Sequence, residues 1–155
     1  MRDESISNAV RFLERPITLT NDVNKWGPWA GKVITGDETT RQIYAIAADG
    51  AVTSFELGIA PEDFDIIPPN QDLYCVNYRY NEPSTVLKLS RQVLANYVGD
   101  LVVTQAGEVS GGAAVFIVSW NGTAFAVRRI PLPPATGAHF EHVTFAPLNL
   151  PALNP

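Results

Sequence analysis

An internal repeat is the feature that most constrains this chain. Residues 29–35 match residues 97–104, and the dipeptide Asp49-Gly50 falls at the same place in its segment as Asn121-Gly122. Matched positions lie about 72 residues apart, so the 155-residue chain holds about two long units. Repeated units of this length indicate a fold built by stacking similar modules.

The spacing of glycine and proline residues in the repeat predicts strands. Eleven glycines and twelve prolines interrupt the chain every few residues and leave no room for long helices. Asp49-Gly50 and Asn121-Gly122 each separate two strand-like runs, which predicts two hairpins with type I′ turns. The run Ala113–Val118 is apolar on both faces and predicts an inner strand covered on both sides. Ser90–Tyr97 predicts a short helix capped by Ser90.

The strand-like segments gather into modules of three. Three such groups are complete: 32–35, 42–48 and 51–57; 64–68, 73–80 and 85–89; and 101–105, 113–120 and 124–131. A fourth begins at 140–145 and lacks its outer strand, which we expect residues 10–14 to supply. Antiparallel modules that repeat and close with a strand from the other terminus are typical of a β-propeller.

We therefore expect an all-β protein with a single domain over residues 1–155. It would be β-propeller-like, with about four modules of three or four antiparallel strands in two long repeats. The repeats would cover approximately 29–96 and 97–155, with 8–28 completing the last module.

Residues 58–74, and residues 97–105 followed by 115–123, resemble the blade-type repeats of bacterial, often secreted, β-propeller proteins. The likeness covers roughly residues 29–145 and is carried by turn glycines, apolar strand positions and the corner Asp63-Phe64-Asp65. The resemblance implies the fold and no particular chemistry, because sites are grafted onto folds. It also implies that related repeats are often extracellular.

The charge of the chain limits the classes of partner that we expect, and its cysteine content limits its covalent cross-links. Lys and Arg number 11 and Asp and Glu 16, and the net charge of −5 argues against nucleic-acid and membrane-surface partners. Cys75 is the only cysteine, so an intrachain disulfide is excluded, and we expect a small core residue there. The polar start Met1–Ser5 lacks the apolar run of a signal peptide, which predicts a cytoplasmic location for this chain.

Charged candidates for a site are few. His139 and Glu141 would share one face of a strand, with His142 on the other. Two ligands make only half a metal site, so we expect no metal and no cofactor. Asp63 and Asp65 occupy the matching corner of the other repeat and are weak candidates for ligand binding together with His139 and Glu141.

Acidic pairs suggest a different chemistry. Asp37 with Glu38, or Glu62 with Asp63 and Asp65, would provide the two carboxyl groups that glycoside hydrolysis needs. Acidic loop residues are more often simply solvated. The paired acids therefore remain an alternative.

Aromatic residues are the more suggestive candidates. Trp26 and Trp29 flank a Gly-Pro turn, and Tyr78 and Tyr80 share a strand face. Exposed aromatic rings can stack on sugar rings or pack against a protein partner. Trp29 matches Tyr97 in the repeat, which favours packing between modules for that residue.

We expect a non-catalytic binding or interaction module whose ligand is a carbohydrate or a protein surface. The alternative is a carbohydrate-active hydrolase or lyase that uses the loop carboxylates. A set of sheets that does not close leaves exposed edges, and residues 146–155 are apolar and uncharged, so we also expect a homo-oligomer.

Overall fold

The computed structural model describes residues 13–107, 112–132 and 139–147, which form an all-β fold with short helical turns. The helical turns are α1 (Val23–Trp26), η1 (Gly27–Trp29), α2 (Arg91–Leu94) and η2 (Ala95–Tyr97). The strands are β1 (Ile17–Thr18), β2 (Val33–Asp37), β3 (Gln42–Ile46), β4 (Val52–Phe55), β5 (Phe64–Ile66), β6 (Gln71–Tyr78), β7 (Thr85–Leu89), β8 (Leu101–Gln105), β9 (Ala114–Trp120), β10 (Phe125–Ile130) and β11 (His139–Pro147).

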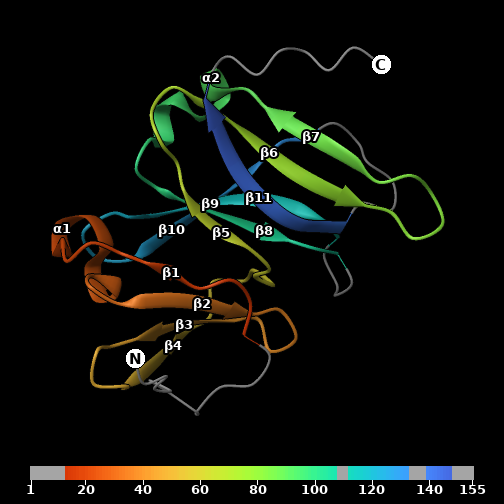
Figure 1. Cartoon of the computed structure of the whole chain (residues 1–155). Helices are drawn as coiled ribbons and strands as arrows, with labels where there is room; N and C mark the ends of the chain where they lie inside the picture. The colour runs from red at the N-terminus through yellow and green to blue at the C-terminus, as the bar shows by residue number, and fades with distance from the viewer. Residues whose placement is uncertain (1–12, 108–111, 133–138, 148–155) are drawn as a thin grey trace, which may run out of the picture.

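These strands pair into three antiparallel sheets. Sheet A has the order β1-β2-β3-β4, sheet B the order β10-β9-β8-β5, and sheet C the order β11-β6-β7. Figure 1 shows sheet B between sheet A below and sheet C above. The expected modules of three or four antiparallel strands are therefore confirmed, although within the described residues the sheets form no closed ring.

Sheets A and B are built alike. In each, a helical turn leads into three strands that pair in chain order, β2-β3-β4 after η1 and β8-β9-β10 after η2. Both helical turns begin at a capped residue: the Asp22 side chain accepts hydrogen bonds from the backbone N–H groups of Asn24 and Lys25, and the Ser90 hydroxyl accepts one from Gln92. The predicted short helix with its Ser90 cap is confirmed.

The second predicted module is wrong. Segments 64–68, 73–80 and 85–89 do not share a sheet, because β5 pairs with β8 whereas β6 pairs with β7 and β11. The chain crosses from sheet A to sheet B at Asp63, whose backbone N–H donates to the Thr104 hydroxyl and whose carbonyl accepts from the Thr104 N–H. The described residues thus form three sheets where about four were expected.

The expected pairing of residues 10–14 with residues 140–145 lies mostly outside the described residues. Glu14, which is described, donates its backbone N–H to the Gly36 carbonyl of β2, so this end of the segment lies against sheet A. Contact with β11 is made by the next side chain, since the Arg15 guanidinium donates to the Val143 carbonyl at 2.9 Å.

Both predicted hairpins are confirmed, but their turn type is wrong. Gly50 and Gly122 have φ of 83° and 97°, whereas Asp49 and Asn121 are not among the residues with positive φ. The turns are longer than two residues, since Ile46 pairs with Val52 and Trp120 pairs with Phe125. The Asp49 and Asn121 side chains instead accept hydrogen bonds from backbone N–H groups of their own turns.

Two apolar clusters hold the three sheets together. Val118 of β9 packs between sheets A and B, while Val115 and Ile117 of the same strand pack between sheets B and C. The prediction that 113–118 forms an inner strand covered on both sides is confirmed. Cys75 is fully buried in the second cluster, and burial raises the pKa of its thiol to about 12, so it stays protonated and serves as a small core residue.

Trp29 is the largest fully buried side chain between sheets A and B. It has 0% of its surface exposed, stacks on Phe125 with ring centroids 3.8 Å apart, and meets the edge of Phe55 at 5.6 Å. Aromatic contacts of this kind add to the free energy gained from burial. Trp29 therefore joins one strand of sheet A to one strand of sheet B.

We expect Trp29→Ala to lower the free energy of unfolding by about 3–5 kcal/mol, because it opens a large cavity between the sheets. Val93→Ala, at a position 52% exposed, is the control and should change stability by less than about 0.5 kcal/mol. Urea denaturation followed by tryptophan fluorescence and circular dichroism measures both. A Trp29→Ala variant as stable as the control would contradict this account of the core.

Candidate functional site

The three sheets meet at the Asp63 carboxylate. Asp63 immediately precedes β5 and is only 1% exposed. Its Oδ2 accepts hydrogen bonds from the Val143 N–H of β11 at 2.8 Å and from the Arg15 guanidinium at 3.3 Å, and its Oδ1 accepts from the Phe64 N–H at 2.9 Å. His142 Nδ1 lies 3.9 Å from the same Oδ2, on a side chain that is 77% exposed. Asp63 is thus a buried joint between elements, with an exposed rim.

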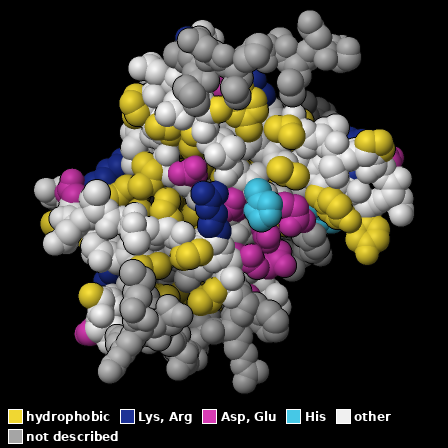
Figure 2. Space-filling view, viewed as in Figure 1, with side chains coloured by type: hydrophobic (Ala, Val, Ile, Leu, Met, Phe, Trp, Pro, Cys, Tyr) yellow, Lys and Arg dark blue, Asp and Glu magenta, His cyan; other side chains and the backbone are white. Residues whose placement is uncertain are grey.

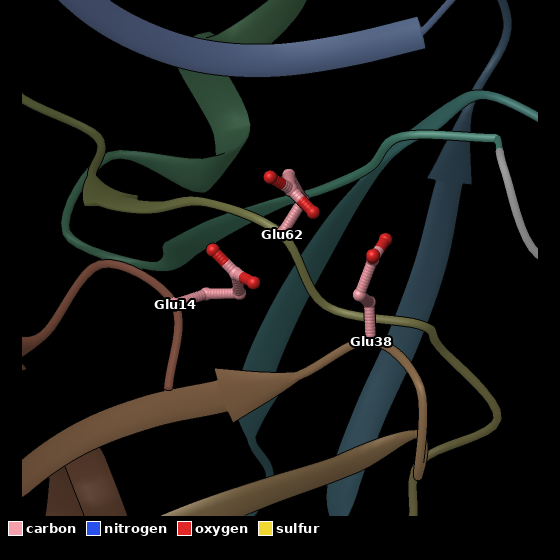
Figure 3. Close-up of side chains that lie close together, drawn as sticks. All are labelled: Glu14, Glu38 and Glu62. Atoms are coloured by element: carbon pink, nitrogen blue, oxygen red, sulfur yellow. The ribbon is translucent and has the colours of Figure 1, made fainter. Parts of the chain in front are cut away.

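That rim is charged. Figure 2 shows acidic side chains gathered at the centre of this face, with one basic side chain and one histidine side chain beside them. Three glutamates lie close together in this region: Glu14 before β1, Glu38 directly after β2, and Glu62 directly before Asp63. Each offers a carboxylate oxygen within 4.8 Å of the others. Figure 3 shows the three carboxyl groups pointing toward one another. We call these residues the glutamate triad.

Two carboxyl groups of the triad have raised pKa values. Burial first, then the charges of Glu14 and Glu38, a hydrogen bond with Glu38 and the charge of Glu141, together raise the pKa of Glu62 to about 9. The pKa of Glu14 is also raised, first by burial and then by Glu38, Asp37, Glu141 and Asp63. A protonated carboxyl group beside other carboxyl groups is an arrangement that can donate and accept protons.

The sequence suggested some of these acids in other combinations. The sequence pairs Glu38 with Asp37, and Glu62 with Asp63 and Asp65, whereas the structure brings Glu38 and Glu62 together with Glu14. Asp37 is buried and accepts a hydrogen bond from the Thr40 N–H, so it shapes its own turn. Glu14 was not predicted, because it is isolated in sequence from both other acids and nothing in its neighbours marks it.

Asp65 does not belong to the triad. Its Oδ1 accepts a hydrogen bond from the Ile66 N–H at 2.8 Å, which orders the start of β5. Its pKa is raised, mainly by burial. Asp63 and Asp65 therefore have structural partners within the protein, and their role as ligand-binding residues stays a prediction.

His139 and Glu141 lie on β11 but not in a regular register. The pairing of β11 with β6 shifts between Phe140 and Val143, so the simple alternation that placed His139 and Glu141 on one face is broken there. His139 pairs with Tyr78, and their rings lie 6.2 Å apart. Glu141 is near enough to the triad to raise the pKa of Glu14 and Glu62.

The four aromatic candidates divide into two groups. Trp26 and Trp29 are 4% and 0% exposed, which excludes them from a surface site and corrects that expectation. Tyr78 and Tyr80, at the end of β6, are 39% and 74% exposed and meet edge to face at 6.1 Å. Between them in sequence, Arg79 forms an ion pair with Glu82 at 2.7 Å. We call Tyr78 and Tyr80 the tyrosine pair.

No protein-family model, no curated protein and no solved structure matches this chain. In the part of the chain that the structure describes, no helix is long and apolar enough to cross a membrane. Within the described residues, the glutamate triad and the tyrosine pair are the two candidate functional features.

The triad predicts a pH-dependent stability. Glu62 keeps its proton up to a pKa of about 9 when folded but releases it near the ordinary value of 4.5 when unfolded. Between these values the folded state binds more protons, so the free energy of unfolding should fall as pH rises from about 4.5 to about 9. Glu62→Gln should remove most of this dependence and should stabilise the protein above neutral pH.

Urea denaturation at about pH 5, 7 and 9 measures the effect. Glu82→Gln, which neutralises a glutamate whose side chain is 65% exposed, is the matched control and should keep the wild-type pH profile. Identical profiles for wild type and Glu62→Gln would show that Glu62 titrates at its ordinary pKa.

Proposed function

We propose that this chain is a non-catalytic binding module of β-propeller type and that it binds carbohydrate at the tyrosine pair. The observation that carries the binding site is the exposure of two adjacent tyrosine rings, 39% and 74%, at one end of sheet C. Three antiparallel sheets stacked A–B–C, with the edge strands β5 and β11 meeting at Asp63, support the propeller architecture.

Carbohydrate fits the tyrosine pair better than a purely apolar ligand does. A tyrosine ring offers an apolar face and a hydroxyl group, and a sugar ring offers C–H groups on its face and hydroxyl groups around its rim. His139 lies beside the Tyr78 ring, and Arg79, paired with Glu82, is next to both tyrosines in the sequence, so both could offer polar groups to those hydroxyls. Binding sites commonly combine an aromatic surface with a few polar groups of this kind.

We expect Tyr80→Ala to weaken binding at least about tenfold, because the more exposed ring of the pair is lost. A glycan array identifies a bound sugar, and calorimetric titration of wild type, Tyr80→Ala and the control Val93→Ala gives the affinities. The carbohydrate assignment would be overturned if Tyr80→Ala bound the sugar as tightly as wild type does. It would also be overturned if the protein bound other proteins but no glycan.

The glutamate triad favours a second candidate, a carbohydrate-active hydrolase. Retaining glycosidases hold two carboxyl groups about 5–5.5 Å apart, one protonated and one ionised, and the triad places a protonated Glu62 within 4.8 Å of Glu14 and Glu38. In this mechanism Glu62 would protonate the leaving oxygen. The test is to incubate the protein with the glycan that it binds and to measure new reducing ends. Reducing ends formed by wild type but not by Glu62→Gln would favour the hydrolase, and their absence with wild type would reject it.

We further propose that the module closes with a second copy. The described residues form three sheets, and among them no further sheet covers the outer faces of sheets A and C, whereas two chains would supply six such sheets, within the four to eight blades of known propellers. Val76 and Val86 face each other across β6 and β7, and Val86 is 63% exposed on this outer face. Tyr78 lies two residues after Val76 and shares this outer face at the last position of β6, whereas Tyr80 lies beyond the strand, so the tyrosine pair lies at the edge of such an interface.

Light scattering at micromolar concentration should therefore give about twice the chain mass of 16.9 kDa. Val86→Glu should shift the protein to the monomer, because it places a charge in the apolar contact, whereas Val93→Glu, at a similarly exposed position on α2, should not. A single 16.9 kDa species for wild type would reject the second copy.

A further inference from the structure

A cavity of about 260 Å³ lies away from both the glutamate triad and the tyrosine pair. One side is the turn of residues 68–71 between β5 and β6, and the other is formed by α2, η2 and Val98. Its lining is mostly apolar, with Leu94 and Val98 among the residues that form it, and Arg91 is the one charged residue of the described lining. The cavity therefore combines an apolar wall with a positive charge.

Within the described residues the nearby acid, Asp72, makes no hydrogen bond with the Arg91 guanidinium, although the two charges interact. Asp72 Oδ1 accepts a hydrogen bond from the backbone N–H of Arg91 at 2.8 Å, and Asp72 Oδ2 pairs with the Lys88 ammonium at 2.7 Å. The hydrogen bond with Lys88 first, then that with the Arg91 N–H, lower the pKa of Asp72, and the charges of Lys88 and Arg91 lower it further. Both oxygens of the carboxylate are thus engaged by groups other than the guanidinium.

Arg91 itself is left incomplete. Its Nη1 is buried and has no hydrogen-bond partner among the described residues. A buried donor without an acceptor costs free energy, and a guanidinium group gains most from a carboxylate, which accepts two parallel hydrogen bonds. Arg91 lines the cavity, so an acceptor there would remove this cost once the guanidinium turned to bring Nη1 to it.

We propose that this cavity binds a small organic carboxylate with an apolar body. The carboxylate pairs with the Arg91 guanidinium, whose fork turns toward the cavity to receive it, and the apolar body covers Leu94 and Val98. The volume is below the roughly 300–1,000 Å³ of pockets for drug-sized ligands, which limits the ligand to a small molecule. This site is independent of the proposed carbohydrate binding.

The overall charge helps to define the ligand. At a net charge of −5 the chain repels anions at long range, so a simple anion gains little from the protein as a whole. Affinity must come from the local pair with Arg91 together with apolar contact. Benzoate should therefore bind, whereas inorganic phosphate, which has no apolar body, should bind much more weakly.

The test is a titration followed by amide chemical shifts in NMR spectra, with benzoate as the probe and benzamide as its uncharged counterpart. Benzoate should bind with a Kd of about 1 mM and shift the amides of Leu94, Ala95 and Val98. Benzamide and phosphate should each bind at least about tenfold more weakly. Arg91→Gln should weaken benzoate binding by the same factor, whereas Arg129→Gln, at an exposed arginine of β10, should not.

The Arg91→Gln variant keeps the backbone N–H that Asp72 accepts, and a thermal melt verifies that it remains folded. Equal binding of benzoate and benzamide would overturn the role of the guanidinium. Equal binding of phosphate and benzoate would overturn the role of the apolar wall. Shifts confined to other amides, or no saturation by benzoate, would reject the site.

Discussion

A single buried carboxyl group, that of Asp63, lies where the three packed sheets come together and fixes the strands around it. The Asp63 carboxylate accepts hydrogen bonds from the N–H groups of Phe64 on β5 and Val143 on β11. It also accepts one from the Arg15 guanidinium, in the segment that leads into sheet A. A carboxyl group that is only 1% exposed is tolerable only with such hydrogen-bond partners. The glutamate triad lies directly on this joint, because Glu62 is the residue next to Asp63.

Local features of the fold could be predicted from the sequence, and distant pairings could not. The hairpins, the Ser90 cap and the doubly covered strand β9 follow from turn residues, a capping hydroxyl and an apolar run, all of which act within a few residues. The pairing of β5 with β8 and of β6 with β11 is decided by contacts such as Asp63 with Thr104 and Val143. No pattern within β5 or β6 specifies those partners.

The candidate site shows the same difference between local features, which the sequence predicts, and distant contacts, which it does not. Glu38 and Glu62 were identified as acids but were assigned to their neighbours in sequence, and Glu14 carried no signal. Burial of Trp29 could be anticipated, because it matches Tyr97 in the repeat. Trp26 could not be placed in this way, because its burial depends on its hydrogen bond to Thr20 and on packing between sheets.

The insertion of β6 and β7 between β5 and β8 has a kinetic consequence. Sheet A is contiguous in the chain and forms from short-range contacts, so it can assemble as soon as residues 17–55 are available. β5 then waits without a partner until β8 has been made, and β6 cannot complete sheet C until the last strand, β11, arrives. During synthesis the protein therefore carries unpaired strand edges for most of its length, the state in which chains are most prone to aggregate.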